Sequence, residues 1–262
     1  SNLGQLEQIR SSKEDKVIFL AAAPDDYPSI YSIDFSIDLS PARKAVIYKA
    51  LVPRELNSAL VSRAKHFQFS SHEEATAYGL LYSPLNAEFK NPSGQLPPLL
   101  VNVHGGPTGT ARAGLNPMHQ FWTSRGFAVL DLNHRGSSGY GRKFRNQLYG
   151  QWGVVDIEDV VAAVHYLIDN KQVAPDKIAI RGGSAGGYAV LASLAACDLF
   201  AAGNSYYGIS DLEILASDTH KFESRYLDQL IGPYPETKEL YQARSPINKL
   251  ANIKAAVLIL QG

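Results

Sequence analysis

Cysteine, long apolar runs and excess charge are all scarce in this sequence. Cys197 is the single cysteine among 262 residues, which excludes an intramolecular disulfide framework and suits a reducing compartment. No stretch approaches the roughly 18 apolar residues that a membrane-spanning helix needs, and no basic segment followed by an apolar run opens the chain. We therefore expect a soluble protein that works in the cytoplasm and not at a membrane.

The charges point to no particular partner. Lys and Arg total 25 and Asp and Glu total 25, so no long-range field favours nucleic acid or a strongly charged substrate. The seven histidines show no metal-ligand spacing. We expect no nucleic-acid partner, no metal ion and no cofactor, and the sequence leaves open whether copies of the chain form a homo-oligomer.

The pattern of apolar residues changes near residue 98. Before it, residues 16–35 and 64–82 predict two pairs of antiparallel strands, residues 39–64 are irregular, and residues 86–98 predict a surface connection. After it, short apolar runs alternate with helical patterns, which predicts a buried parallel sheet. We expect strands at 99–104, 127–133, 177–181, 201–206 and 255–261, and helices at 117–125, at 156–170 and opening at residue 184.

Three acidic residues stand in the first turns of the second expected helix. The N-terminal end of a helix dipole favours carboxylates, so we expect Asp156, Glu158 and Asp159 to have structural roles.

Ser184 stands among four glycines in KIAIRGGSAGGYAV, residues 177–190, where a strand pattern becomes a helix pattern. This G-x-S-x-G context is typical of a nucleophile elbow, in which a serine in a strained turn projects above the sheet. A side chain at Gly182 or Gly186 would crowd the adjacent strand or helix. The alternative is a phosphate cradle, but no Lys-Ser/Thr follows and the spacing differs from a dinucleotide fingerprint. We predict that Ser184 is a catalytic nucleophile.

A glycine-rich turn after the first parallel-type strand, VNVHGGP at 101–107, suits an oxyanion hole. Acyl transfer builds negative charge on a carbonyl oxygen, and rigid N–H donors aimed there are worth on the order of 3 kcal/mol each. We expect Ala185 to supply one donor and Gly105 or Gly106 the other. His104 precedes the serine, so we expect it to orient the turn and not to act as the base.

No complete catalytic triad can be read from the sequence. In this fold the acid and then the histidine follow the serine, with the histidine after the last strand. Only His220 follows Ser184, and it and Asp211 both precede the strand at 255–261, so we expect local structural roles for them. We expect the acid and the base after Gly262, which would leave that apolar strand at an unprotected edge.

With HGGP at 104–107 and GGSAGG at 182–187, the chain resembles the prolyl oligopeptidase family of serine peptidases, most closely its acylaminoacyl-peptidase-like branch. The resemblance covers about residues 64–262. Further similar motifs are NHRGSSGYGR at 133–142, WGVVD at 152–156, HKFESRYL at 220–227 and RSPI at 244–247.

The resemblance implies an α/β-hydrolase fold with a mostly parallel central sheet, preceded by a β-rich remnant of a β-propeller. Residues 1–63 would be the last part of the propeller, and residues 64–262 a catalytic domain incomplete at its C-terminus. It implies cleavage of short or acylated peptides by Ser184, with the Ala185 amide in the oxyanion hole. Prolyl oligopeptidase has a tyrosine where His104 stands, so a backbone amide would complete the hole here. Without acid and base the 262-residue chain would be nearly inactive, while its full-length parent is a peptidase.

Two other functions fit the same scaffold. A carboxylesterase or lipase uses the same elbow, and a non-catalytic binding module could retain it. The propeller-like first segment and NHRGSSGYGR favour the peptidase. Tyr207, Phe222 and Tyr226 are candidates for a substrate pocket, although aromatic residues at such places are more often part of the core.

Overall fold

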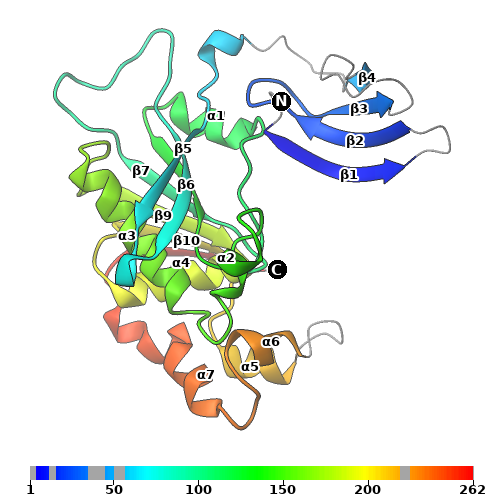
Figure 1. The fold of residues 1–262 in the computed structure, drawn as a ribbon. Coiled ribbons are helices and arrows are strands. Elements are labelled where there is room, and N and C mark those ends of the chain that lie inside the picture. The colour runs from blue at the N-terminus through cyan, green and yellow to red at the C-terminus, as the bar shows by residue number, and fades with distance from the viewer. Residues whose placement is uncertain (1–3, 12–15, 35–44, 50–56, 219–224, 262) are drawn as a thin grey trace.

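The computed structural model describes residues 4–11, 16–34, 45–49, 57–218 and 225–261, which form two β-sheets (Figure 1). The smaller sheet has four antiparallel strands in chain order, β1 to β4. Its strands are β1 Gln5–Ser11, β2 Lys16–Ala22, β3 Ser29–Asp34 and β4 Ala45–Lys49.

The hairpin predicted within residues 16–35 is confirmed, since β2 and β3 pair from Lys16 opposite Asp34 to Ala21 opposite Ser29. The prediction was incomplete on either side of it. β1 was not predicted, and β4 lies inside the stretch 39–64 that was expected to be irregular. Residues 39–44 and 50–56 of that stretch lie outside the described residues.

The larger sheet has seven strands in the order β11-β10-β9-β7-β8-β6-β5. The five strands from β11 to β8 are parallel, whereas β6 pairs antiparallel with both β8 and β5. Its strands are β5 Lys65–Ser70, β6 Thr76–Tyr82, β7 Leu99–Val103, β8 Ala128–Asn133, β9 Ile178–Gly183, β10 Ala202–Tyr206 and β11 Ala256–Leu260. Every strand predicted for this sheet is therefore present, with ends that differ by one or two residues.

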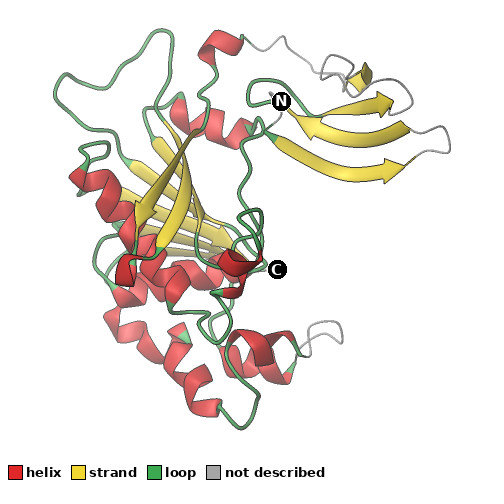
Figure 2. Cartoon of the chain, in the orientation of Figure 1, coloured by secondary structure: helices red, strands yellow, loops and turns green. Residues whose placement is uncertain are grey.

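Helices cover both faces of the larger sheet, because its central strands are apolar on both sides. Val101 and Leu130 pack with helices α3 (Val155–Asp169) and α4 (Ala185–Ala196). Their neighbours Leu100 and Val129 face the other way and pack with Trp122 of α1 (Pro117–Thr123). Figure 2 shows the helices gathered against the sheet, while the smaller sheet stands apart.

Four helices were not predicted: α2 Arg142–Asn146, α5 Leu212–Ser217, α6 Tyr226–Leu230 and α7 Lys238–Arg244. Each has five to seven residues, too short to show a clear helical period. Short 3-10 turns complete the structure at Ser58–Leu60, His72–Glu74 and Pro246–Asn252. Within the described residues, no helix is both long and apolar enough to cross a bilayer.

The segment before α1 contacts both sheets. The backbone N–H of Leu115 donates to the carbonyl of Ala23 at 3.0 Å, and Arg112 pairs with Glu7 of β1. A mostly parallel sheet, with α3 and α4 on one face and α1 on the other, is the α/β-hydrolase arrangement, and the chain has this fold. The separate four-stranded antiparallel sheet has the form of a propeller blade.

Candidate active site

Ser184 occupies the turn between β9 and α4, with φ 55° and ψ −124°. A positive φ is costly for a residue with a Cβ, so surrounding contacts must hold this conformation. The backbone N–H of Ser184 donates to Tyr206 at 3.0 Å, and its carbonyl accepts from Tyr188 at 3.0 Å. The side chain is exposed. The turn therefore presents the hydroxyl to solvent while its backbone is fixed to β10 and α4.

Glycines beside Ser184 allow this turn because backbone atoms approach closely. A Cβ on Gly186 would lie 2.2 Å from the carbonyl oxygen of Val103, and a Cβ on Gly182 would lie 2.5 Å from the oxygen of Gly186. Real Cβ atoms essentially never approach other atoms so closely. The predicted crowding at both positions is confirmed.

The turn after β7 comes to the same place. A Cβ built on Gly105 would lie 3.6 Å from the Cβ of Ser184, so the two turns are in contact. In the described part of the chain, the backbone N–H groups of Gly105, Gly106 and Ala185 have no hydrogen-bond acceptor. Unpaired, rigidly held donors beside a serine suit a developing oxyanion.

His104 holds the turn after β7 and is neutral. Its Nδ1 lies 2.9 Å from the carbonyl oxygen of Gly105, which can only accept, so Nδ1 carries the proton. Nε2 then accepts from the hydroxyl of Ser137 at 2.7 Å. Burial and the stacked ring of His134 lower the pKa of His104 to about 3. His104 thus makes its contacts within the turn.

An apolar cavity of about 140 Å³ opens beside Ser184. Its lining comes from the turn after β7, from the segment before α3, and from α5 and α6. The lining residues are Gly106, Pro107, Trp152, Ser184, Ala185, Ile209, Leu215, Tyr226, Leu227 and Leu230. The cavity suits an uncharged, apolar group next to the reacting atoms.

Of the three aromatic residues proposed for a substrate pocket, Tyr207, Phe222 and Tyr226, only Tyr226 is part of the described cavity lining. Tyr226 lines the cavity. Tyr207 does not line it: the residue has φ 38°, is 63% exposed, and its hydroxyl lies beside Gly183, where a Cβ would be 2.7 Å away. The ring of Tyr207 therefore lies at the end of β9, and Tyr207 is not part of the cavity lining. Phe222 lies outside the described residues.

No histidine in the described ranges forms a hydrogen bond with Ser184. His66 contacts Tyr140, and His119 lies 3.2 Å from Asp131. Asp211 caps α5 by accepting from the backbone N–H groups of Glu213 and Ile214, which is the local role expected of it. His220 lies outside the described residues.

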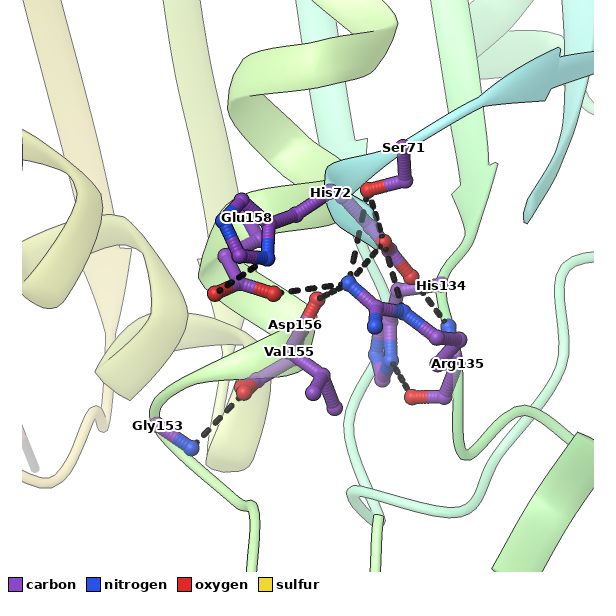
Figure 3. A network of polar contacts seen from close by, with 9 residues as sticks. Ser71, His72, His134, Arg135, Gly153, Val155, Asp156 and Glu158 are labelled. Atoms are coloured by element: carbon purple, nitrogen blue, oxygen red, sulfur yellow. Dashed lines mark hydrogen bonds and ion pairs between the residues drawn. The ribbon is translucent and has the colours of Figure 1, made fainter. Parts of the chain in front are cut away.

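The loop at residues 134–141 supports the turn after β7, and ion pairs anchor it to α3. Arg135 donates to Asp159 from its backbone N–H at 2.6 Å and from Nε at 2.9 Å. It also donates to Glu158 from Nη2 at 2.8 Å (Figure 3). These contacts raise the pKa of Arg135, although burial opposes them. The acidic residues of α3 were expected to have structural roles near the helix N-terminus. Glu158 and Asp159 also accept hydrogen bonds from the buried Arg135.

Asp156 in the same helix differs from its neighbours. It is completely buried and accepts from the backbone N–H of Gly153 at 2.7 Å (Figure 3). Burial raises the pKa of this carboxyl above its ordinary value, while the nearby His134 and the Gly153 hydrogen bond lower it.

Sequence reasoning missed most of the cavity. Trp152, Ile209, Leu215 and Leu230 come from segments distant in the chain, and their apolar character alone marks them only as core. Three of the motifs noted for family similarity, at 104–107, 152–156 and 220–227, do contain lining residues: Gly106, Pro107, Trp152, Tyr226 and Leu227. Ser138 lies in the motif at 133–142, whereas Thr108, whose carbonyl accepts from Ser138, carried no signal.

The fold and the turn at Ser184 define the class of protein: an α/β hydrolase with nucleophile-elbow geometry. Residues 115–262 match the prolyl oligopeptidase family. The match covers more than half of the chain, and the chain belongs to this family.

Known relatives are peptidases. The chain is 31% identical over 257 residues to dipeptidyl aminopeptidase BIII of Pseudoxanthomonas mexicana, covering 95% of this chain and 37% of that protein. A puromycin-hydrolyzing peptidase of Mycobacterium tuberculosis superposes with TM-score 0.89 at 39% identity, over 97% of this chain and 39% of that one. Pyrococcus horikoshii acylaminoacyl peptidase gives TM-score 0.79 at 25% identity, over 97% and 39%. This chain thus spans well under half the length of these relatives.

Proposed function

We propose that Ser184 is the nucleophile of a serine peptidase that cleaves short peptides through an acyl-enzyme. The observation that carries this proposal is the exposed serine in a strained turn, in contact with a second turn whose N–H groups are unpaired. The family and its peptidase members favour peptide over ester substrates.

In the proposed reaction, the Ser184 oxygen attacks the carbonyl carbon of the scissile peptide. The hydroxyl proton passes to a base and then to the leaving amine as the C–N bond breaks. Water next attacks the acyl-enzyme and releases the carboxylate product. The amide of Ala185 and that of Gly105 or Gly106 stabilise the oxyanion that forms during acylation and again during hydrolysis of the acyl-enzyme.

We assign the side chain on the acyl side of the cleaved bond to the apolar cavity. Its volume of about 140 Å³ and its apolar wall favour an uncharged side chain of small or medium size. A charged side chain there would lose hydration against Ile209, Leu227 and Leu230, whose side chains offer it no ionic partner.

We propose that none of the seven histidines of this chain is the base of the triad, since His220, like the others, precedes β11. No described histidine contacts Ser184, and His104 is engaged with Gly105 and Ser137. The 262-residue chain alone should therefore react slowly, because the serine oxygen keeps its proton.

A fluorophosphonate probe tests the proposal, with adducts located by intact mass and peptide mapping. The 262-residue chain should acquire one adduct slowly, at Ser184, and added imidazole should accelerate the reaction by replacing the base. Ser184→Ala should abolish labelling, while Ser217→Ala, at an exposed helical serine, should leave it unchanged. Labelling that persists in Ser184→Ala refutes the nucleophile. Fast labelling without imidazole refutes the placement of the base.

Domain limits and location are also proposals. We assign residues 1–63 to the end of a β-propeller and residues 64–262 to the catalytic unit, supported by a gap between the sheets from Lys49 to Lys65. Limited proteolysis should cut first within that gap. The single cysteine supports a cytoplasmic location, which cell fractionation would test.

A further inference from the structure

Thr108 lies between the turn that follows β7 and the wall of the apolar cavity. Its hydroxyl oxygen is 2.8 Å from the hydroxyl oxygen of Tyr226, the first residue of α6. Tyr226 lines the cavity, and so do Gly106 and Pro107, which immediately precede Thr108. One hydrogen bond therefore joins the cavity wall to a residue two positions from a candidate oxyanion donor.

The far side of this turn is fixed. The carbonyl of Thr108 accepts from the hydroxyl of Ser138 at 2.7 Å, and the carbonyl of Gly109 accepts from the backbone N–H of Ser138 at 2.8 Å. Asn133 accepts from the backbone N–H of Ala111 at 2.7 Å. These contacts tie residues 108–111 to the loop that Arg135 anchors on α3 (Figure 3).

The Tyr226 side is fixed to a different segment. The carbonyls of Gln229 and Leu230 in α6 accept from the backbone N–H groups of Gly150 and Trp152 at 2.8 and 3.1 Å, and Leu227 packs in the same apolar cluster as Trp152. These contacts hold α6 on the segment before α3, and the Thr108–Tyr226 hydrogen bond joins it to the turn after β7. A group that enters the cavity touches the same helix, through Tyr226, Leu227 and Leu230.

We propose that the Thr108–Tyr226 hydrogen bond couples occupancy of the cavity to the position of the Gly106 amide. Both are then positioning residues that make the reaction faster for a substrate whose side chain fills the cavity. The inference rests on the proposed function, because it concerns the oxyanion hole of that reaction. A side chain packed against Tyr226 holds α6, and the hydrogen bond passes that constraint to Thr108. A substrate that leaves the cavity empty does not use this connection.

The chain offers closely matched variants. Thr108→Val keeps the shape and removes the hydroxyl, Tyr226→Phe removes the partner, and Thr108→Ser keeps the hydroxyl. The rate of Ser184 labelling is measured in the presence of imidazole with two amino-acid phosphonate probes, one with a leucine side chain and one with a glycine side chain. Each hydroxyl deletion should slow the leucine probe about tenfold, the scale of one hydrogen bond, and slow the glycine probe much less.

The double variant distinguishes coupling from two separate effects. Thr108→Val with Tyr226→Phe should lose no more than either single variant, because both remove the same contact. Thr108→Ser should recover most of the rate. Additive losses, or equal losses with both probes, overturn the inference.

Hydrogen exchange gives a readout that needs no reaction at Ser184. The amides of Gly109 and Ala111, which donate to Gly105 and Asn133, should exchange faster in Thr108→Val and in Tyr226→Phe than in the parent chain, and N-acetylleucinamide should slow their exchange only in the parent. Unchanged exchange in both variants overturns the inference. Failure of Ser184 to label in the parent chain refutes the proposed function instead, and the exchange result still decides the coupling.

Discussion

Replacing Asp159 by asparagine should destabilise the protein strongly, because it removes the charge that holds Arg135. The two side chains are 0% and 8% exposed. Asp159 accepts from the Arg135 backbone N–H, from Nε and from the hydroxyl of Ser71. The amide of asparagine replaces one of its oxygens with a donor, so at least one of these N–H groups loses its acceptor.

The expected loss of stability depends on the partners that Arg135 keeps in the Asp159→Asn variant. Breaking a buried pair by removing one partner costs about 3 to 5 kcal/mol, since the other charge is left in a poorly solvated place. Glu158, 30% exposed, still accepts from Arg135 at 2.8 Å. We therefore expect a loss near the lower limit, about 3 kcal/mol in the free energy of unfolding.

Urea unfolding followed by fluorescence measures this loss as a lower midpoint at unchanged slope. Asp198→Asn is the matched control, because Asp198 pairs with Lys254 at side-chain exposures of 61% and 73%. An exposed pair contributes about 1 kcal/mol or less, so the control should change little. If Asp159→Asn costs less than about 1 kcal/mol, or no more than the control, the buried pair does not anchor the loop as argued.

Three further predictions concern the turn at Ser184 and the carboxyl of Asp156. Gly186→Ala should lower the free energy of unfolding by at least about 2 kcal/mol, because its Cβ meets the carbonyl oxygen of Val103. Gly150→Ala is the control: Gly150 has φ 69° and open space around it, so the loss should be about 1 kcal/mol. Equal losses in urea unfolding would contradict the packing argument. Ser184→Gly should be more stable than Ser184→Ala by about 1 kcal/mol, since only glycine relieves the strain at φ 55°. The reverse order of the two variants in thermal unfolding would show that the turn is unstrained. The raised pKa of Asp156 means that the folded state binds its proton more tightly than the unfolded state, whose value is about 3.8, so this contribution to stability is lost as pH rises through the folded pKa. Asp156→Asn should therefore gain stability relative to the parent as the pH rises from about 4 through the folded pKa, and a difference that moves the other way contradicts the assignment.

Much of the large sheet could be predicted because its signals are local. The apolar runs at β7 and β8 match strands that are buried on both faces, and the Ile-Ala-Ile run of β9 matches a strand whose residues alternate between buried and half-buried. Each run can be seen in a few consecutive residues. The small sheet was predicted less completely. β1 is mostly exposed, and five of its seven residues are polar or charged, so its sequence resembles a surface segment.

The candidate site divides in the same way. The turn at Ser184 is a five-residue feature whose glycines and serine stand side by side, and its conformation follows from sterics within that stretch and one close neighbour. The cavity, by contrast, joins residues from 106 to 230, and Thr108 meets Tyr226 across 118 positions of the chain. Nothing in either local sequence favours the other partner.

The sequence by itself determined the parallel strands, the strand-to-helix turn and the position of the candidate nucleophile, because periodicity and backbone sterics act over a few residues. Only the tertiary structure decided that His104 is a half-buried neutral ring bonded to Ser137, that Asp159 accepts from Arg135, and that Tyr226 lines the cavity while Tyr207 does not. These outcomes depend on which residues, distant in the chain, pack together and shield one another from water. Buried donors and acceptors must then form hydrogen bonds with each other, because water cannot reach them.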